Sequence, residues 1–144
     1  MKRTRARLSA GGLRELTRAE EEIMHVLWRL ERAFVKDIVA QLPDPKPAYN
    51  TVSTIVRILQ DKGFVGHTAY GKTHQYHPIV TKEAYSEFLM KGMVNNYFGG
   101  SLGRMVSFFV RQNDVSLQEF EALMAQVQGE ITDETPAAGS TPAR

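Results

Sequence analysis

Residues 49–65 read YNTVSTIVRILQDKGFV and combine a helical repeat of apolar side chains with a glycine stop. An α-helix rotates by about 100° per residue, so the apolar side chains of this stretch fall on one face and predict a buried helix over residues 48–62. The residues of that face are Val52, Ile55, Val56 and Leu59. Gly63 then occupies the place where a left-handed residue commonly ends a helix.

The opposite face of the same helix is polar but nearly uncharged. It carries Asn50, Ser53, Thr54 and Arg57, with Thr51 at its rim. Solvated helix faces usually carry Glu, Lys and Arg, so short hydrogen-bonding side chains in this pattern indicate contact with the edges of DNA bases. The alternative is a polar face that simply meets water.

Two further helices are expected before this one. Thr17 and Glu20 have the spacing of a capping box, which predicts the start of a helix whose apolar face contains Ile23 and Leu27. Residues 35–42 predict a short second helix that ends at Pro43. Its start at residues 32–34 offers no good N-cap side chain.

The apolar period changes to two after Gly63. Residues 64–69 and 73–77 predict two strands joined by a turn at residues 70–72. Three helices followed by a hairpin, with a short second helix and a polar third, is the order of a winged helix-turn-helix, in which the hairpin lies over the phosphate backbone of DNA.

The chain is predicted to be helical from residue 81 onward. One helix ends at the Gly99-Gly100 break, a second begins at Ser101, and Ser116 with Glu119 form another capping box that starts a third. Three short helices cannot cover this much apolar surface by themselves, so we expect burial against a second copy of the chain. The alternative is that they fold back on the winged domain. The residues expected at the dimer interface are Tyr85, Leu89, Leu102, Met105, Val106, Phe109, Phe120 and Leu123.

The predicted fold class is therefore mainly α (α+β). A winged helix-turn-helix domain at residues 15–79 precedes a helical dimerisation domain at residues 80–128, and residues 1–14 and 129–144 are expected to be a disordered basic arm and a disordered tail. Residues 1–80 contain 13 Lys and Arg against 8 Asp and Glu, whereas residues 81–144 contain 5 against 8. This asymmetry favours a polyanionic partner for the first half and a different task, such as self-association, for the second.

The composition excludes several classes of protein. No apolar run approaches the roughly 20 residues that a membrane-spanning helix needs, and no signal sequence is recognisable, so we expect a cytoplasmic protein without membrane contact. The absence of cysteine excludes disulfides, thiolate zinc sites and iron–sulfur clusters.

Enzymatic activity is not expected either, nor is a cofactor. The sequence has no glycine-rich phosphate loop, no nucleophile elbow and no pair of carboxylates in a plausible cleft. His74 and His77 are three residues apart on a predicted strand, where their side chains point to opposite faces. We therefore expect no metal site there.

Several of these segments resemble one known family. They are LTRAEEEIM at residues 16–24, YNTVST at 49–54, LQDKGFV at 59–65, and YFGG at 97–100 ahead of FFV at 108–110. These segments are similar in order and spacing to those of the penicillinase and methicillin-resistance repressors (BlaI/MecI), and the similarity covers about residues 15–125. This family also includes CopY-type copper-responsive repressors.

The resemblance implies a homodimeric transcriptional repressor that binds dyad operators with TACA- and TGTA-like halves. By position, it implies that Asn50, Thr51, Ser53 and Thr54 read bases and contact phosphates. Position 50 is often Lys in relatives, and an Asn there suits bidentate pairing with adenine. Arg57, and Lys72 at the wing tip, would hold phosphates.

Two departures from the family pattern bear on regulation. Copper-responsive members carry a C-terminal cysteine cluster that this chain lacks. In β-lactam-responsive members a partner sensor protease cleaves an Asn-Phe bond, and the aligned bond here is Ser107-Phe108. Two other functions stay open: a winged-helix regulator that binds a small effector, and a protein-interaction module that does not bind DNA.

Overall fold

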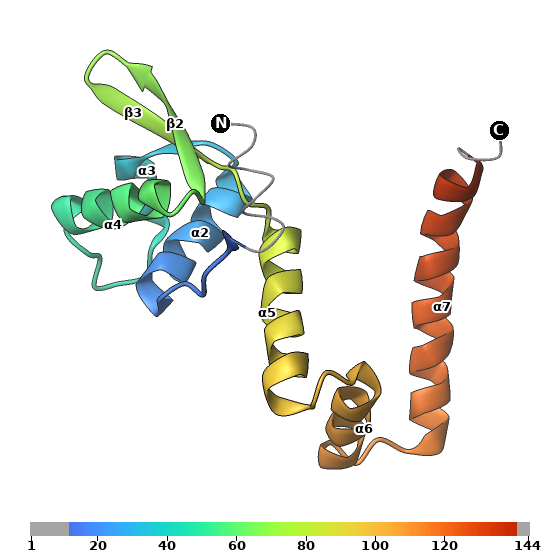
Figure 1. Ribbon diagram of the computed structural model, residues 1–144. Coiled ribbons are helices and arrows are strands. Elements are labelled where there is room, and N and C mark those ends of the chain that lie inside the picture. Colours follow the sequence, from blue (N-terminus) through green and yellow to red (C-terminus); the bar gives the residue numbers. More distant parts are fainter. Residues whose placement is uncertain (1–11, 141–144) are drawn as a thin grey trace. The chain divides into compact units, whose positions relative to one another are not determined.

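The computed structural model describes residues 12–140 and divides the chain into two units, with the division after Gly92 (Figure 1). The first unit contains helices α2 (Arg18–Leu30), α3 (Val35–Gln41) and α4 (Tyr49–Asp61) and strands β1 (Ala33–Phe34), β2 (Val65–Tyr70) and β3 (Thr73–Pro78). Helix α5 (Lys82–Tyr97) crosses the division, and helices α6 (Leu102–Gln112) and α7 (Leu117–Ser140) follow it. The fold is a winged helix-turn-helix followed by a helical C-terminal region, as the sequence predicts.

The hydrophobic core of the first unit is built from the apolar faces of its helices together with the sheet. Val52, Val56 and Leu59 of α4 are fully buried, which confirms the predicted inner face of this helix. Ile55 is half-buried at the edge of the same core. Leu13 is also a core residue, so the folded part begins earlier than residue 15, the start that we expected. Residues 1–11, which make up most of the expected basic arm, lie outside the described residues.

Gly63 ends helix α4 in the manner that the sequence predicts. Its φ angle is +87°, a left-handed value that glycine adopts without strain. The amide of Phe64 donates to the carbonyl of Leu59 at 2.9 Å, and the amide of Gly63 donates to Gln60 at 3.0 Å. These two bonds form a Schellman motif, which turns the chain directly from α4 into strand β2.

The wing is a three-stranded antiparallel sheet in the order β1-β3-β2, rather than the two-stranded hairpin that we expected. The added strand β1 pairs Ala33 with Tyr76 and Phe34 with Gln75. It lies directly before α3, and the Phe34 amide donates to the Asp37 carboxylate at 3.0 Å. This bond stabilises the start of α3, where residues 32–34 offer no good N-cap side chain. Strand β1 connects the wing to the rest of the domain.

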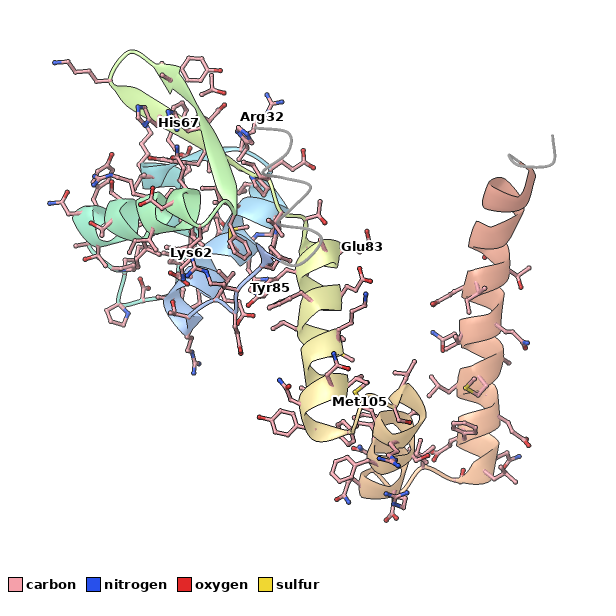
Figure 2. All side chains as sticks on the ribbon, in the orientation of Figure 1. Arg32, Lys62, His67, Glu83, Tyr85 and Met105 are labelled. Carbon is pink, nitrogen blue, oxygen red and sulfur yellow. The ribbon has the colours of Figure 1, made fainter. Side chains whose placement is uncertain are left out.

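Tyr85 of α5 belongs to the core of the first unit, which differs from its predicted place at a dimer interface. Its side chain is only 3% exposed, and its hydroxyl accepts a hydrogen bond from the Leu16 amide at 2.7 Å (Figure 2). Its ring contacts those of Trp28, Phe64 and Phe88. A residue buried this fully within one chain has almost no surface left to offer a second copy.

The first half of α5 therefore completes the winged domain. Phe88 and Leu89 also pack against its core, and the two units divide after Gly92 instead of after residue 79. Leu89 was likewise expected at the dimer interface, and it is half-buried here.

Helices α6 and α7 begin at the predicted signals, and α5 ends at the predicted glycine break. Gly99 and Gly100 have φ angles of +60° and +79° and separate α5 from α6. Ser101 caps α6 by accepting from the Arg104 amide, and Ser116 and Glu119 form the predicted capping box before α7. Helix α7 continues to Ser140, past the expected tail boundary at Gly129. None of the described helices is long and apolar enough to span a membrane.

A buried ion pair connects the start of α2 to the end of α4. Glu20 is 5% exposed, and its carboxylate accepts hydrogen bonds from the Thr17 amide at 2.9 Å and from Lys62 Nζ at 2.9 and 3.0 Å. The Glu20 amide in turn donates to the Thr17 hydroxyl, which confirms the predicted capping box. Burial raises the pKa of Glu20, but the bonds from Thr17 and Lys62 outweigh it and hold the pKa below its ordinary value of 4.5.

Replacing this carboxylate should destabilise the fold in a pH-dependent way. Because the folded-state pKa of Glu20 is lowered, its contribution is complete above the pKa of the unfolded chain and is lost as the pH falls through the folded-state pKa. We expect Glu20→Gln to lower the free energy of unfolding by about 1–3 kcal/mol at pH 7, because Lys62 loses its partner. The deficit relative to wild type should shrink below about pH 4. Urea unfolding at several pH values measures both effects.

The matched control is Glu22→Gln. Glu22 lies on the exposed side of the same helix, and its closest approach to Arg18 is 4.0 Å. This exchange should change stability by less than about 0.5 kcal/mol. A Glu20→Gln deficit that stayed constant down to pH 3 would contradict the assigned role of the charge.

Candidate nucleic-acid interface

The outer face of helix α4 presents its polar side chains to solvent. Asn50, Thr51, Thr54 and Arg57 are exposed and Ser53 is half-exposed, while Val52 and Val56 point into the core. Burial of one face fixes the rotation of the helix about its axis, so the polar residues are held outward as a group. The structure thus places all five predicted residues of α4 on one accessible surface.

A groove of about 310 Å³ lies where α4 faces strand β3 and the start of α3. Asn50, Ser53 and Arg57 line it from α4, and Lys72 and His74 line it from the wing. Four of the six residues predicted to bind DNA therefore meet around one concave surface. Thr51 and Thr54 lie on the same helix but do not line this groove.

The groove is positively charged. Arg57 and Lys72 contribute two cations from opposite sides, and none of the described lining residues is acidic. The guanidinium of Arg57 donates to Ser53 Oγ at 3.2 Å, which orients it along the face of α4. Such a concave surface suits an anion, and a phosphate of a nucleic-acid backbone fits both its charge and its position beside the polar face of α4.

Two residues of the outer face differ in what they can offer a ligand. The Thr54 hydroxyl donates to the Asn50 carbonyl within the helix at 3.0 Å, so its hydrogen is already used. Among the described residues, the side-chain amide of Asn50 has no hydrogen-bond partner and keeps both its donor and its acceptor for an outside group. Asn50 is therefore the better candidate for reading a base.

The wing contributes aromatic residues that sequence reasoning did not assign to the site. His67 lies on the wing (Figure 2) and stacks on His74, with ring centroids 4.0 Å apart and an angle of 8° between planes. Its Nδ1 atom lies 3.1 Å from Gln60 Oε1 of α4. Tyr76 and His74 both line the groove. The period-two alternation of β3 puts these two side chains on one face, but only the register with β2 brings His67 beside them.

The wing tip is a tight turn at Gly71 and Lys72. Gly71 has a φ angle of +64°, and Lys72 is exposed next to it. Strand β2 extends through Tyr70, one residue further than the sequence indicated, and the Tyr70 ring packs edge-on against Phe34 at 6.0 Å. This contact anchors the base of the turn that presents Lys72.

Neutralising a groove cation should weaken binding to any duplex DNA. We expect Arg57→Gln to reduce the affinity for different DNA sequences by similar factors, because one phosphate contact is lost. The slope of the logarithm of the binding constant against the logarithm of the salt concentration, which is negative, should become less steep by about 1. Fluorescence anisotropy titrations between 50 and 200 mM salt measure both quantities. Arg18→Gln, an exposed arginine on α2, is the matched control and should leave the slope unchanged.

Comparison with known proteins gives a consistent set of similarities. The family model described as penicillinase repressor matches residues 16–129. The methicillin resistance regulatory protein MecI of Staphylococcus aureus (strain N315) is 27% identical over 110 residues, covering 76% of this chain and 89% of that protein. The penicillinase repressor of Bacillus licheniformis is 24% identical over 110 residues, covering 76% of this chain and 86% of that protein.

Among solved structures, the solution structure of the DNA-binding domain of the repressor BlaI is similar to part of this chain. The match has 24% sequence identity and a TM-score of 0.44, and it covers 49% of this chain and 88% of that domain.

Proposed function

The chain belongs to the penicillinase repressor family, and from this membership we propose that it is a homodimeric transcriptional repressor that binds double-stranded DNA at a dyad operator. The family consists of transcriptional repressors and not of enzymes. The observation that carries the proposal is the outer face of α4. There the Asn50 amide has no partner among the described residues, and Arg57 and Lys72 flank a groove without acidic residues in its described lining. We place its action in the cytoplasm, where its operator DNA lies.

The proposed binding mode follows from the geometry of the first unit. Helix α4 would enter the major groove with Asn50, Thr51, Ser53 and Thr54 toward the base edges. Arg57 and Lys72 would contact phosphates on either side of the groove described above. The family resemblance supports operators with TACA- and TGTA-like halves, and Asn50 would pair with an adenine through its two side-chain hydrogen bonds.

The proposed dimer rests on uncovered apolar surface in the second unit. Helix α6 has no buried residue among those described, and Leu102 and Phe109 are 61% and 63% exposed. Val106, Leu123 and the half-buried Met105 and Phe120 extend this surface along α6 and α7. Apolar patches of this extent on soluble proteins mark interaction sites, and a second copy covers them symmetrically.

A sensor protease remains part of the proposal as a regulatory partner. The bond that aligns with the cleavage site of relatives, Ser107-Phe108, lies in the middle of α6, and both residues are exposed. A protease must hold its substrate in an extended form, so cleavage there would require local opening of α6.

The operator itself can be obtained by selecting bound duplexes from a random pool. A dimer should recover inverted repeats whose half-site centres are separated by about one helical turn, roughly 34–36 Å, or a multiple of it. Recovery of single half-sites would contradict the dimer, and recovery of no sequence preference would contradict operator recognition.

Truncating the proposed base-reading side chain should reduce specificity. We expect Asn50→Ala to weaken binding to the selected operator by about 1–3 kcal/mol while changing affinity for random duplex much less, because a base contact is lost and the phosphate contacts remain. Thr54→Ala should act in the same direction. Anisotropy titrations with both duplexes provide the comparison. Asn96→Ala, an exposed asparagine on α5, serves as the control, and equal losses on both duplexes would disprove base reading by Asn50.

A charge in the proposed dimer interface should separate the copies. Val106→Asp would bury an unpaired carboxylate against a second copy, and we expect monomers at micromolar concentration in sedimentation experiments. Ser107→Asp places the same charge on the adjacent residue, which faces away from the Val106 side of α6, and should remain dimeric. An intact Val106→Asp dimer would remove this face of α6 from the interface.

A further inference from the structure

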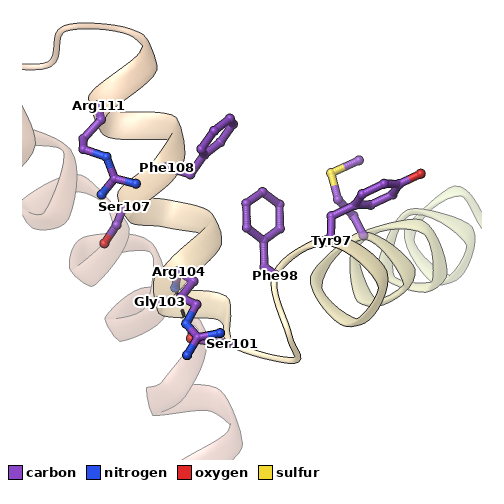
Figure 3. Close-up of a pocket in the computed structure, with 9 residues that line it drawn as sticks. Tyr97, Phe98, Ser101, Gly103, Arg104, Ser107, Phe108 and Arg111 are labelled. Carbon is purple, nitrogen blue, oxygen red and sulfur yellow. Dashed lines mark hydrogen bonds between the residues drawn. The ribbon is translucent and has the colours of Figure 1, made fainter.

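The second unit contains a cavity that the proposed function does not use. It has a volume of about 1060 Å³ and lies between the end of α5 and helix α6 (Figure 3). The rings of Phe98 and Phe108 contact each other on one side of it, with centroids 5.5 Å apart, and Tyr97 also lines it. This lining offers an apolar body a large surface against which to pack.

The same cavity carries two positive charges and no negative one. Arg104 and Arg111 line it from α6, and none of its described lining residues is acidic. Among the described residues, neither arginine has a carboxylate within 4.0 Å. Their guanidinium groups therefore keep their hydrogen-bond donors for an outside anion, with the planar fork that suits a carboxylate.

Local backbone geometry leaves room for one of these arginines. Arg104 Nη1 lies 2.9 Å from the position that a Cβ atom would take on Gly99, and Gly99 has a φ angle of +60°. Any other residue at this position would be strained and would displace the guanidinium. Gly99 thus both ends α5 and makes room for Arg104 at the cavity wall.

The cavity lies on the face of α6 opposite to the proposed dimer interface. At 100° per residue, Arg104, Ser107, Phe108 and Arg111 point to the side away from Leu102, Met105, Val106 and Phe109. Provided that the proposed dimer forms through the latter residues, a second copy leaves the cavity accessible.

We propose that this cavity is a binding site for a small amphipathic carboxylate with an aromatic body. The aromatic body would pack against the contacting rings of Phe98 and Phe108 and beside Tyr97, and the carboxylate would accept hydrogen bonds from Arg104 or Arg111. These two arginines are seven residues apart, about 10 Å along the helix axis, so a single carboxylate can form hydrogen bonds with only one of the two guanidinium groups. The second guanidinium attracts the carboxylate electrostatically from a greater distance. The volume suits a drug-sized molecule rather than a free inorganic anion.

Calorimetric titration of the full chain without DNA tests this proposal with three probes. We expect 1-naphthoate to bind with one site per chain, at least tenfold more tightly than its neutral analogue 1-naphthalenemethanol, because only the carboxylate pairs with an arginine. Acetate, which lacks the apolar body, should bind more weakly than either. Equal affinity for naphthoate and the alcohol, or no naphthoate binding up to millimolar concentration, would overturn the proposal.

Substitution of the arginines locates the site. Arg104→Gln and Arg111→Gln should each weaken naphthoate binding, by about tenfold for the arginine that holds the carboxylate, whereas Arg18→Gln on α2 should leave it unchanged. Phe108→Leu should weaken naphthoate and the alcohol by similar factors, since it removes only a wall. An equal loss in Arg18→Gln would show general ionic attraction and would overturn the assigned site.

Sedimentation of the same variants separates this site from a protein interface. The arginine variants should remain dimeric; if they become monomers, the cavity seats a second copy and the ligand proposal fails. Because the titration needs no DNA, it can show naphthoate binding even if the operator selection yields no sequence preference. Conversely, the selection can yield an operator even if naphthoate does not bind, so the two proposals can fail independently.

Discussion

Helix α4 can bury only one of its faces, and most of the first unit is arranged around that constraint. Val52, Val56 and Leu59 are fixed in the core, so the rotation of the helix is set and Asn50, Thr54 and Arg57 must face outward. The Glu20–Lys62 ion pair then holds the end of α4 against the start of α2. The Schellman turn at Gly63 directs the chain into the wing from that same point. The proposed recognition surface, which consists of short polar side chains, is thus positioned by contacts on the opposite side of the helix.

The wing shows how a second element turns this helix face into a site. A polar helix surface alone offers an anion little enclosure. Strand β3 brings Lys72 and His74 opposite Arg57, and the short strand β1 fixes β3 to the domain. The result is a groove with cations on both sides. The surface therefore contains two kinds of side chain: those that suit hydrogen bonds with bases, such as Asn50, and those that suit phosphates, such as Arg57 and Lys72.

The second unit has a different physical character. Its helices are capped and ended by strong local signals, yet α6 buries none of its described side chains within one chain. Helix α6 carries two unlike faces: an aliphatic and aromatic one, and one with arginines beside aromatic rings. The first suits a second copy of the same surface, and the second suits a small anion with an apolar body.

The sequence by itself determined the positions of the helices and most of their caps and breaks, because these depend on residues no more than four positions apart. Thr17 with Glu20, Ser116 with Glu119, Gly63 and the Gly99-Gly100 pair all act as their local patterns indicate. The periodicity of α4 likewise determined which of its residues are buried and which are exposed. Family membership was also recognisable from these segments.

Only the tertiary structure decided which surfaces meet. Strand β1 has two residues and no periodicity of its own, and it exists because β3 offers hydrogen bonds at its edge. The apolar stripe of α5 does not reveal what covers it, and the structure assigns Tyr85 to the winged domain rather than to a dimer interface. The groove at Arg57 and Lys72 and the cavity at Arg104 and Phe108 each combine separate elements of the chain. Spacing along a chain specifies the faces of an element, whereas contacts between elements depend on packing in three dimensions.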